Sequence, residues 1–205
     1  KGDDNGQTKE KGISSDLTGI NVKEGMTLVG IVTDLETGLP IQGVVVSDGY
    51  TSTITDVSGI YQMKRNTKAR HVFCSIPSDC EVIIKNNLPD YFAQIYSYYE
   101  IFRKDFKLKK LAGGVENKFT LFCLADPQVK TGTDYSRCQT ETMPDIKSEI
   151  AKSGGICYGI TLGDIVYDTP DMMNSMKSLF PSSGVKFFHV IGNHDHYQET
   201  TNDMD

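Results

Sequence analysis

Three apolar segments in the second half of the chain constrain its fold more than any other feature. They lie at residues 119–125, 156–162 and 185–191, and apolar side chains follow one another in them rather than alternating with polar ones. Strands that are buried on both faces of a parallel sheet have this pattern. Because parallel strands need a crossover connection of a dozen or more residues, the segments between them should be helical.

The two intervening segments carry the signals of helices. Residues 142–154 have a Thr at the capping position, a Pro in the first turn and a Gly at the end. Residues 169–184 show the same order of Thr, Pro and closing Gly. Ser and Thr favour the start of a helix, Pro its first turn and Gly the position after its end. The second half is therefore predicted to be an α/β unit with three parallel strands and right-handed crossover helices.

The first half shows a different pattern, in which short β-branched runs alternate with turns rich in Gly, Pro and Asp. Several short strands with closely spaced turns are typical of a β-sandwich. The fold class is therefore a β-sandwich domain followed by α/β. We expect a flexible polar tether at 1–24, the β-sandwich at 25–108, a linker at 109–118 and an incomplete α/β domain at 119–205.

Charge and hydropathy exclude some classes of partner. Nucleic-acid binding needs positive charge that binds the phosphate backbone. The net charge of −6 argues against it, so no nucleic acid polymer is expected as a partner. The sequence contains no run of 18 apolar residues, so no transmembrane segment is expected. The polar residues 1–24 resemble the segment that follows the lipidated Cys of exported lipoproteins in Gram-negative bacteria. The resemblance implies an exported protein, either periplasmic or lipid-anchored at the cell surface.

Each of the three apolar segments ends in side chains that can bind metals or transfer protons. In a parallel sheet the carboxyl ends of the strands share one edge, where α/β folds bind their ligands. Residues far apart in the sequence should therefore meet there. The polar residues after the three segments are Asp126 and Gln128, then Asp164, Tyr167 and Asp168, and finally Asn193, His194, Asp195 and His196.

Carboxylates at one sheet edge repel one another unless a cation lies between them. A carboxylate has two oxygens and can bridge two ions that are about 3.5–4 Å apart. Asp164 follows the middle segment and is best placed to be this bridge, while Gln128 and Asn193 offer amide oxygens. Mixed oxygen and nitrogen ligands suit Mn, Fe or Zn better than Ca. The sequence thus predicts two divalent metal ions.

The motifs "DPQ", "GDIVYD" and "GNHD" resemble those of the calcineurin-like metallophosphoesterases. That family has Asp-x-His, then Gly-Asp-x-x, then Gly-Asn-His followed by Asp or Glu. In the first half, "GLPIQGVVVSDG" and "TDVSGIYQM" resemble the transthyretin-like, carboxypeptidase-regulatory type of sandwich that often precedes bacterial phosphoesterases. The resemblance implies a metal-dependent hydrolase that acts on phosphoric ester bonds, with a phosphoester as its substrate.

The resemblance also implies which residues hold the two metals. Asp126 and Gln128 would bind the first, Asp164 would bridge both, and Asn193 would bind the second. Gln128 stands where the family usually has His, and a neutral amide oxygen is a weaker ligand than imidazole. One metal is therefore expected to be held loosely.

In the same resemblance, His194 is the general acid for the leaving alkoxide and Asp195 orients its ring. Tyr167 occupies the position of the iron-binding tyrosinate of purple acid phosphatases, but a packed or hydrogen-bonded ring is the simpler hypothesis. Asp168 either orients the metal-binding side chains by hydrogen bonding or caps the following helix. His196 either touches the substrate or faces solvent.

Among the remaining histidines, His71 is expected at a solvated strand edge and His189 in a hydrogen-bonded position in the core.

Two alternatives remain at the level of the whole chain. The family takes further ligands from a later His and a late Gly-His-x-His, and these residues contain no such motif. Either the chain is a fragment or a partner chain completes the sheet, and we expect weak metal binding and slow turnover from these residues alone. The rival function is a non-catalytic cell-surface binding or scaffold module with a remnant phosphoesterase half.

Overall fold

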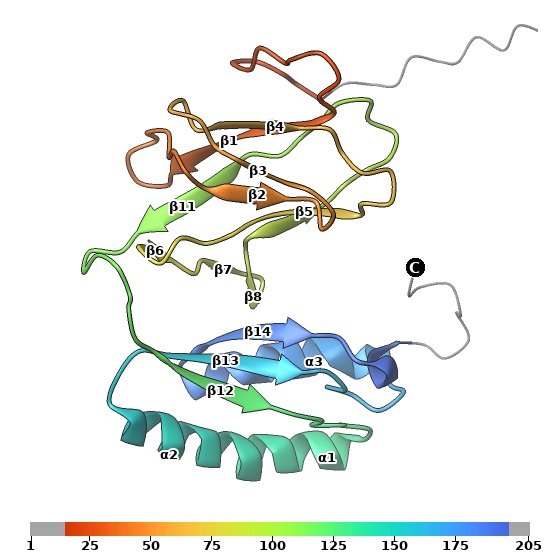
Figure 1. The fold of residues 1–205 in the computed structure, drawn as a ribbon. Helices are drawn as coiled ribbons and strands as arrows, with labels where there is room; N and C mark the ends of the chain where they lie inside the picture. The colour runs from red at the N-terminus through yellow and green to blue at the C-terminus, as the bar shows by residue number, and fades with distance from the viewer. Residues whose placement is uncertain (1–14, 197–205) are drawn as a thin grey trace, which may run out of the picture. The chain divides into compact units, whose positions relative to one another are not determined.

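A computed structural model describes residues 15–196 of the protein (Figure 1). The chain is mostly β-sheet with few helices and divides into two compact units. The first comprises Lys1–Glu81 and Tyr91–Val115, and the second comprises Val82–Asp90 and Glu116–Asp205. Among residues 15–196, none of the helices has both the length and the apolar character needed to cross a membrane.

The first unit contains two β-sheets. One has five strands, in which β1 (Leu28–Asp34) pairs in parallel with both β10 (Phe102–Arg103) and β11 (Phe106–Lys110). Its remaining strands are β4 (Ile60–Met63), antiparallel to β1, and β6 (Cys80–Glu81), antiparallel to β11. The other sheet has the order β3-β2-β5-β9, with β2 at Val45–Ser47, β3 at Ser52–Ile54, β5 at His71–Cys74 and β9 at Phe92–Gln94.

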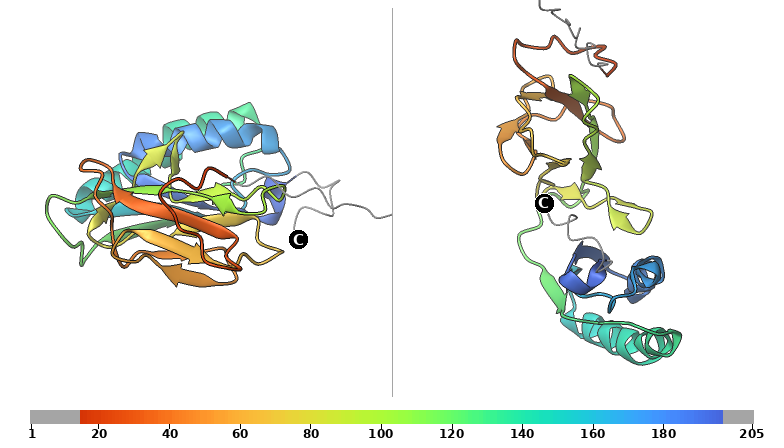
Figure 2. Two further views of the ribbon diagram at one scale, coloured as in Figure 1. Left: turned by 90° about the horizontal axis from the view of Figure 1, so that it is seen from above. Right: turned by 90° about the vertical axis from the view of Figure 1, so that its right-hand side faces the viewer.

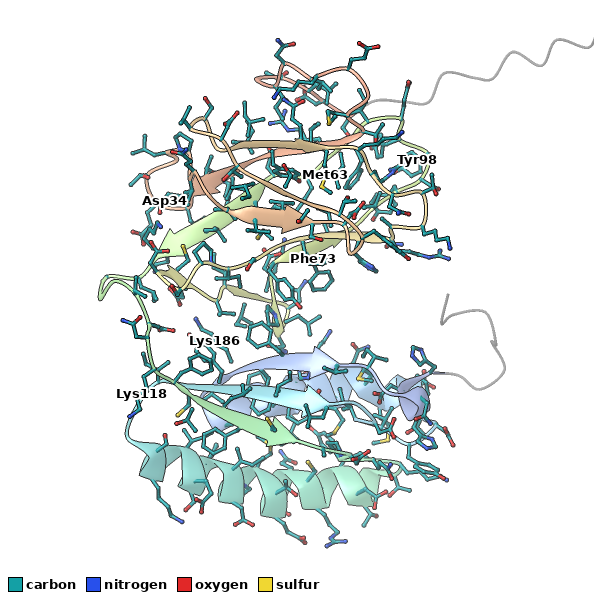
Figure 3. All side chains as sticks on the ribbon, in the orientation of Figure 1. Asp34, Met63, Phe73, Tyr98, Lys118 and Lys186 are labelled. Carbon is teal, nitrogen blue, oxygen red and sulfur yellow. The ribbon has the colours of Figure 1, made fainter. Side chains whose placement is uncertain are left out.

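The core of the first unit is made of side chains from both sheets. Leu28 and Val32 of β1 are fully buried, as are Val46 of β2 and Val72 of β5. Met63 of β4, labelled in Figure 3, belongs to the same cluster. Burying such side chains contributes about 1.5–3 kcal/mol each, so this cluster is what holds the short strands together.

Part of the predicted tether is ordered against the first unit. The backbone N–H of Ser15 donates to the carbonyl of Ile101, and the Arg103 side chain donates to the carbonyls of Asp16 and Thr18. The described part of the tether is therefore bound to the strand that contains Arg103. The rest of it, residues 1–14, lies outside the described residues.

The second unit is built on a three-stranded parallel sheet in the order β12-β13-β14. Its strands are β12 (Thr120–Leu124), β13 (Cys157–Leu162) and β14 (Lys186–Val190). Helices α2 (Met143–Ser153) and α3 (Met173–Leu179) connect them and lie together on one side of the sheet (Figure 2). Short 3₁₀ turns are η2 (Pro170–Met172), η3 (Phe180–Ser183) and η4 (Asn193–Asp195).

The helical segment before β13 is longer than the sequence predicts. It begins with α1 (Gly132–Arg137), continues through the π-helix η1 (Cys138–Thr142) and ends with α2. Thr131 caps it, because its side chain accepts from the backbone of Asp134 while the Asp134 carboxylate accepts from the backbone of Thr131. Gly154 ends it in the left-handed conformation, with φ at 65°.

Only one face of the parallel sheet is covered within the described residues. On that face Phe187 packs with Met143, Met176 and Phe180 from the helical segments. On the other face Leu121, Leu162 and Val190 keep 46%, 51% and 46% of their surface exposed. The expectation of strands buried on both faces is therefore wrong for the structure of residues 15–196.

A hairpin from the first half of the sequence belongs to the second unit. It consists of β7 (Ile84–Lys85) and β8 (Leu88–Pro89), joined by Asn86 and Asn87, which both have positive φ as a tight two-residue turn requires. Leu88 lies with Ile165, Phe180 and His189 around an apolar cavity of about 210 Å³. The expected domain limit at 108 stays a prediction, and the compact units follow a different division.

His189 is half-buried beside β13. Its Nδ1 lies 3.2 Å from the Thr161 hydroxyl, and its ring lies 5.2 Å from that of Phe180. Its Nε2 is buried without a hydrogen-bond partner in the part of the chain that the structure describes. Burial, helped by the charge of Lys177, lowers the pKa of His189 to about 4.

The pKa of His189 predicts how acid destabilises the protein. An unfolded His titrates near pH 6.5, so between about pH 6.5 and 4 the unfolded chain binds more protons than the folded one. The free energy of unfolding therefore falls as the pH drops through this window. His189→Phe should make the fall between pH 7 and pH 5 smaller in urea titrations. Equal slopes in the variant and in the unmodified protein would show that His189 does not cause the fall.

Candidate active site

The loops that follow β12 and β13 run side by side. The backbone N–H of Gln128 donates to the carbonyl of Asp164 over 2.9 Å, and Val129 forms a parallel bridge with Val166. This pairing extends the strand alignment beyond the strand ends. Side chains from residues 36 positions apart in the sequence are thereby brought together.

The carboxylate of Asp164 contacts both of its neighbouring loops. Its Oδ2 lies 3.5 Å from Nε2 of Gln128, and its Oδ1 accepts from the backbone N–H of His194 over 3.1 Å. Asp126 and Asn193 are exposed at the ends of the same strands. Within residues 15–196 neither of these two side chains forms a hydrogen bond or ion pair with Asp164. The structure thus brings Gln128, Asp164 and the backbone of His194 into contact. Asp126 and Asn193 are exposed and do not take part in these contacts.

The backbone at the strand ends is strained. Asp126, Gln128, Asp164 and Asp168 have φ values of 47°, 45°, 47° and 54°. Non-glycine residues seldom adopt this left-handed region, and each instance costs roughly 1–3 kcal/mol that the surrounding structure must offset. Such residues cluster at active sites, so their concentration here indicates function. Apart from the tolerance of Asp for this conformation, residue type does not indicate this strain.

Gly192 allows the loop after β14 to reach Asp164. A Cβ atom at this position would lie 2.1 Å from Oδ1 of Asp164 and 2.4 Å from its backbone nitrogen. No side chain can be placed there without moving one of the two loops. A glycine directly before Asn193 is therefore a steric requirement of the site.

The His194 ring is held by Asp168 and Tyr167. Nδ1 of His194 lies 2.8 Å from Oδ1 of Asp168, and the backbone N–H of Asp168 donates to the carbonyl of His194. The rings of Tyr167 and His194 stack with centroids 4.4 Å apart and planes at 16°. The carboxylate of Asp168 raises the pKa of His194 above its usual value, because it stabilises the imidazolium.

Asp195 has a different role from the one expected for it. It is buried, and its two oxygens accept from the backbone N–H groups of Val166 at 2.9 Å and Gly192 at 2.8 Å. It therefore ties the second and third loops together. The carboxylate that contacts the His194 ring is that of Asp168, which corrects the expectation that Asp195 orients it.

Lys130 lies outside the three sequence motifs but contacts one of their residues. Its Nζ lies 4.5 Å from the centroid of the Tyr167 ring, a distance suited to a cation–π contact. Tyr167 therefore contacts both an ammonium group and the His194 ring, as a packed aromatic side chain does. His196 is half-buried where the described part of the chain ends.

The donor set suits a cation only in part. Among residues 15–196, no three His, Cys, Asp or Glu side chains lie where they could hold one metal ion. Two of the four expected ligands, Gln128 and Asn193, are amides. The amide nitrogen of Gln128 faces the Asp164 carboxylate. Turning the Gln128 amide by 180° exchanges its nitrogen and oxygen and places the oxygen beside that carboxylate. Gln128 and Asp164 thus fit a hard cation that accepts oxygen ligands, with few protein ligands around it.

Comparison with known proteins finds one family. Residues 26–111 match the family described as the N terminal of Calcineurin-like phosphoesterase, which supports the relation to phosphoesterases expected from the motifs. The match covers less than half of the chain and ends before the strand-end residues. None of the curated proteins matches the chain significantly.

Gly192→Ala should destabilise the protein. The new methyl group would overlap Asp164, and overpacking of this kind costs about 1–3 kcal/mol in the free energy of unfolding. Gly155→Ala is the matched control, because a Cβ there meets nothing within 4 Å. Urea unfolding of both variants measures the difference. Equal stability of the two would show that the loops are not packed as described.

Asp168→Asn should lower the pKa of His194 in the metal-free protein. The substitution removes the negative charge that favours the protonated ring and leaves the size of the side chain unchanged. Titration of the imidazole C–H resonances by NMR measures the shift. Asp171→Asn removes a nearby exposed carboxylate and serves as the control, whose His194 titration should match that of the unmodified protein.

Proposed function

We propose that the protein is a metal-dependent phosphoester hydrolase. In this proposal a β-sandwich of the transthyretin-like type precedes an α/β unit that carries the reaction, and the protein is exported. The observation that carries the proposal is the meeting of Gln128, Asp164 and His194 from three separate strand ends at the carboxyl edge of a parallel sheet. The family match over residues 26–111 supports the same class of activity.

The residues would divide the work between metal binding and proton transfer. Asp126, Gln128, Asp164 and Asn193 would hold two divalent cations, with Asp164 between them. When bound, such cations neutralise charge on the phosphoryl group and lower the pKa of water. These four side chains offer oxygen ligands only, and of the expected metals Mn suits such a set best.

His194 is suited to be the general acid. Asp168 contacts Nδ1, so Nε2 is the nitrogen left to donate a proton to the leaving oxygen. The raised pKa of His194 increases the fraction of protonated ring near neutral pH, which general-acid catalysis requires. Stacking on Tyr167 fixes the plane of the ring.

A binding or scaffold module is the second candidate function. It is favoured by the observation that no three acidic, His or Cys side chains within residues 15–196 lie around a common metal position. In that case the contacts of Asp164 would serve only to hold the three loops together.

Manganese binding separates the two functions. Calorimetric titration of the chain with Mn²⁺ should show weak binding that Asp164→Asn reduces by at least about tenfold, since even residues outside the ligand shell change metal affinity that much. Asp145→Asn removes an exposed carboxylate on α2 and should have no effect. Hydrolysis of p-nitrophenyl phosphate in the same samples should be slow and manganese-dependent. Absence of binding and of hydrolysis would favour the module.

A further inference from the structure

A cavity of about 330 Å³ adjoins the candidate site on the β12 side. It shares Gln128 with that site, so a molecule in the cavity would lie next to a residue that contacts Asp164. Its size is at the lower end for pockets that hold small ligands. Apolar side chains, among them Leu124, Val129 and Phe180, form part of its lining.

Another part of the lining comes from the π-helix η1. The backbone N–H of Met143 donates to the carbonyl of Cys138, which is the five-residue spacing of a π-helix in place of the four-residue spacing of α1 and α2. Cys138, Glu141 and Thr142 of this segment all line the cavity. π-helical turns are rare and occur frequently at functional sites, so the one that lines this cavity is a second indication of a ligand.

The charged groups around the cavity give it a negative balance. Arg137 is neutralised by Glu141, with which it forms contacts of 3.1–3.3 Å through Nε and Nη2. Hydrogen bonds from Thr131 lower the pKa of Asp134, which therefore remains ionised at neutral pH. Two carboxylates thus face one guanidinium, and a further anionic group in the cavity would be repelled.

We propose that this cavity receives the alcohol part of the phosphoester, and that this alcohol carries no negative charge of its own. A cationic alcohol, such as an amino alcohol or a quaternary-ammonium alcohol, fits the apolar lining and the negative balance best. The inference rests on the proposed hydrolase function, because it assigns the phosphoryl group to the neighbouring strand ends. Phosphoesters of acidic alcohols, including those with a second phosphate, are then poor substrates.

Binding of three small alcohols tests the cavity without metal and without turnover. Choline, glycerol and glycerate serve as cationic, neutral and anionic probes, and amide shifts of Gln128 and Thr142 in the full chain report occupancy by NMR. We expect choline to bind most tightly and glycerate least. The affinity should fall about two- to fivefold from choline to glycerol and again from glycerol to glycerate, as for single exposed charge contacts. Equal affinities, or no shift with any probe, would overturn the proposal.

Glu141→Lys reverses one charge of the lining and should invert the order, so that glycerate binds more tightly than choline. Glu149→Lys is the matched control, because Glu149 lies on α2, is exposed, forms a comparable ion pair with Lys152 and does not line the cavity. Both substitutions affect exposed side chains, and thermal unfolding checks that both variants fold. If the two variants change the affinities alike, the effect is one of overall charge and the cavity is not the site.

The outcome for the cavity is distinguishable from that for the hydrolase. Loss of the manganese and hydrolysis results with the order of alcohol affinities intact would leave a binding site for cationic alcohols and remove the phosphoester reaction. Manganese-dependent hydrolysis with no order among the probes would keep the hydrolase and remove the cavity as its substrate site.

Discussion

The carboxylate of Asp164 is the point on which the arrangement of the strand ends depends. Asp164 lies in the middle one of three loops. Its carboxylate contacts the Gln128 side chain from the first loop and the backbone of His194 from the third. The contact with His194 needs the third loop to approach Asp164 closely, which the missing side chain of Gly192 permits. Asp164 itself also adopts a strained backbone conformation, with φ at 47°. The proposed chemistry is therefore built on a geometry that costs free energy to maintain.

Buried hydrogen bonds offset part of that cost. Asp195 is almost fully removed from solvent, and it accepts from the backbone of Val166 and of Gly192 in two different loops. Hydrogen bonds to a charged acceptor contribute about 1.5–3 kcal/mol each, which is comparable to the strain of one residue. Asp195 thus stabilises the loops, while Asp168 governs the ring that would carry the proton.

The indications of a phosphoesterase come from two separate parts of the chain. The family match covers residues 26–111, most of which belong to the first compact unit. The contacts on which the proposed hydrolysis rests lie in residues 126–195, all within the second unit. The hairpin of β7 and β8 belongs to the matched region and also to the second unit, so the matched sequence contributes directly to the unit that carries the candidate site.

The sequence by itself determined that three apolar strands end in polar side chains, because strand direction and apolar runs are local properties. It also predicted that Asp126, Asp164 and Asn193 would meet at one sheet edge, since parallel pairing follows from the intervening helices. The structure brings the Gln128 side chain and the His194 backbone to Asp164, and the meeting of Asp126 and Asn193 with it stays a prediction. Only the tertiary structure decided that Asp168 and not Asp195 contacts the His194 ring. Adjacent residues in a tight turn point in different directions, and the direction depends on the loop against which the turn packs. The π-helix was likewise decided by packing, because it has no local signal in residue type or spacing. The exposed sheet face, in contrast, agrees with the expectation of an incomplete α/β domain.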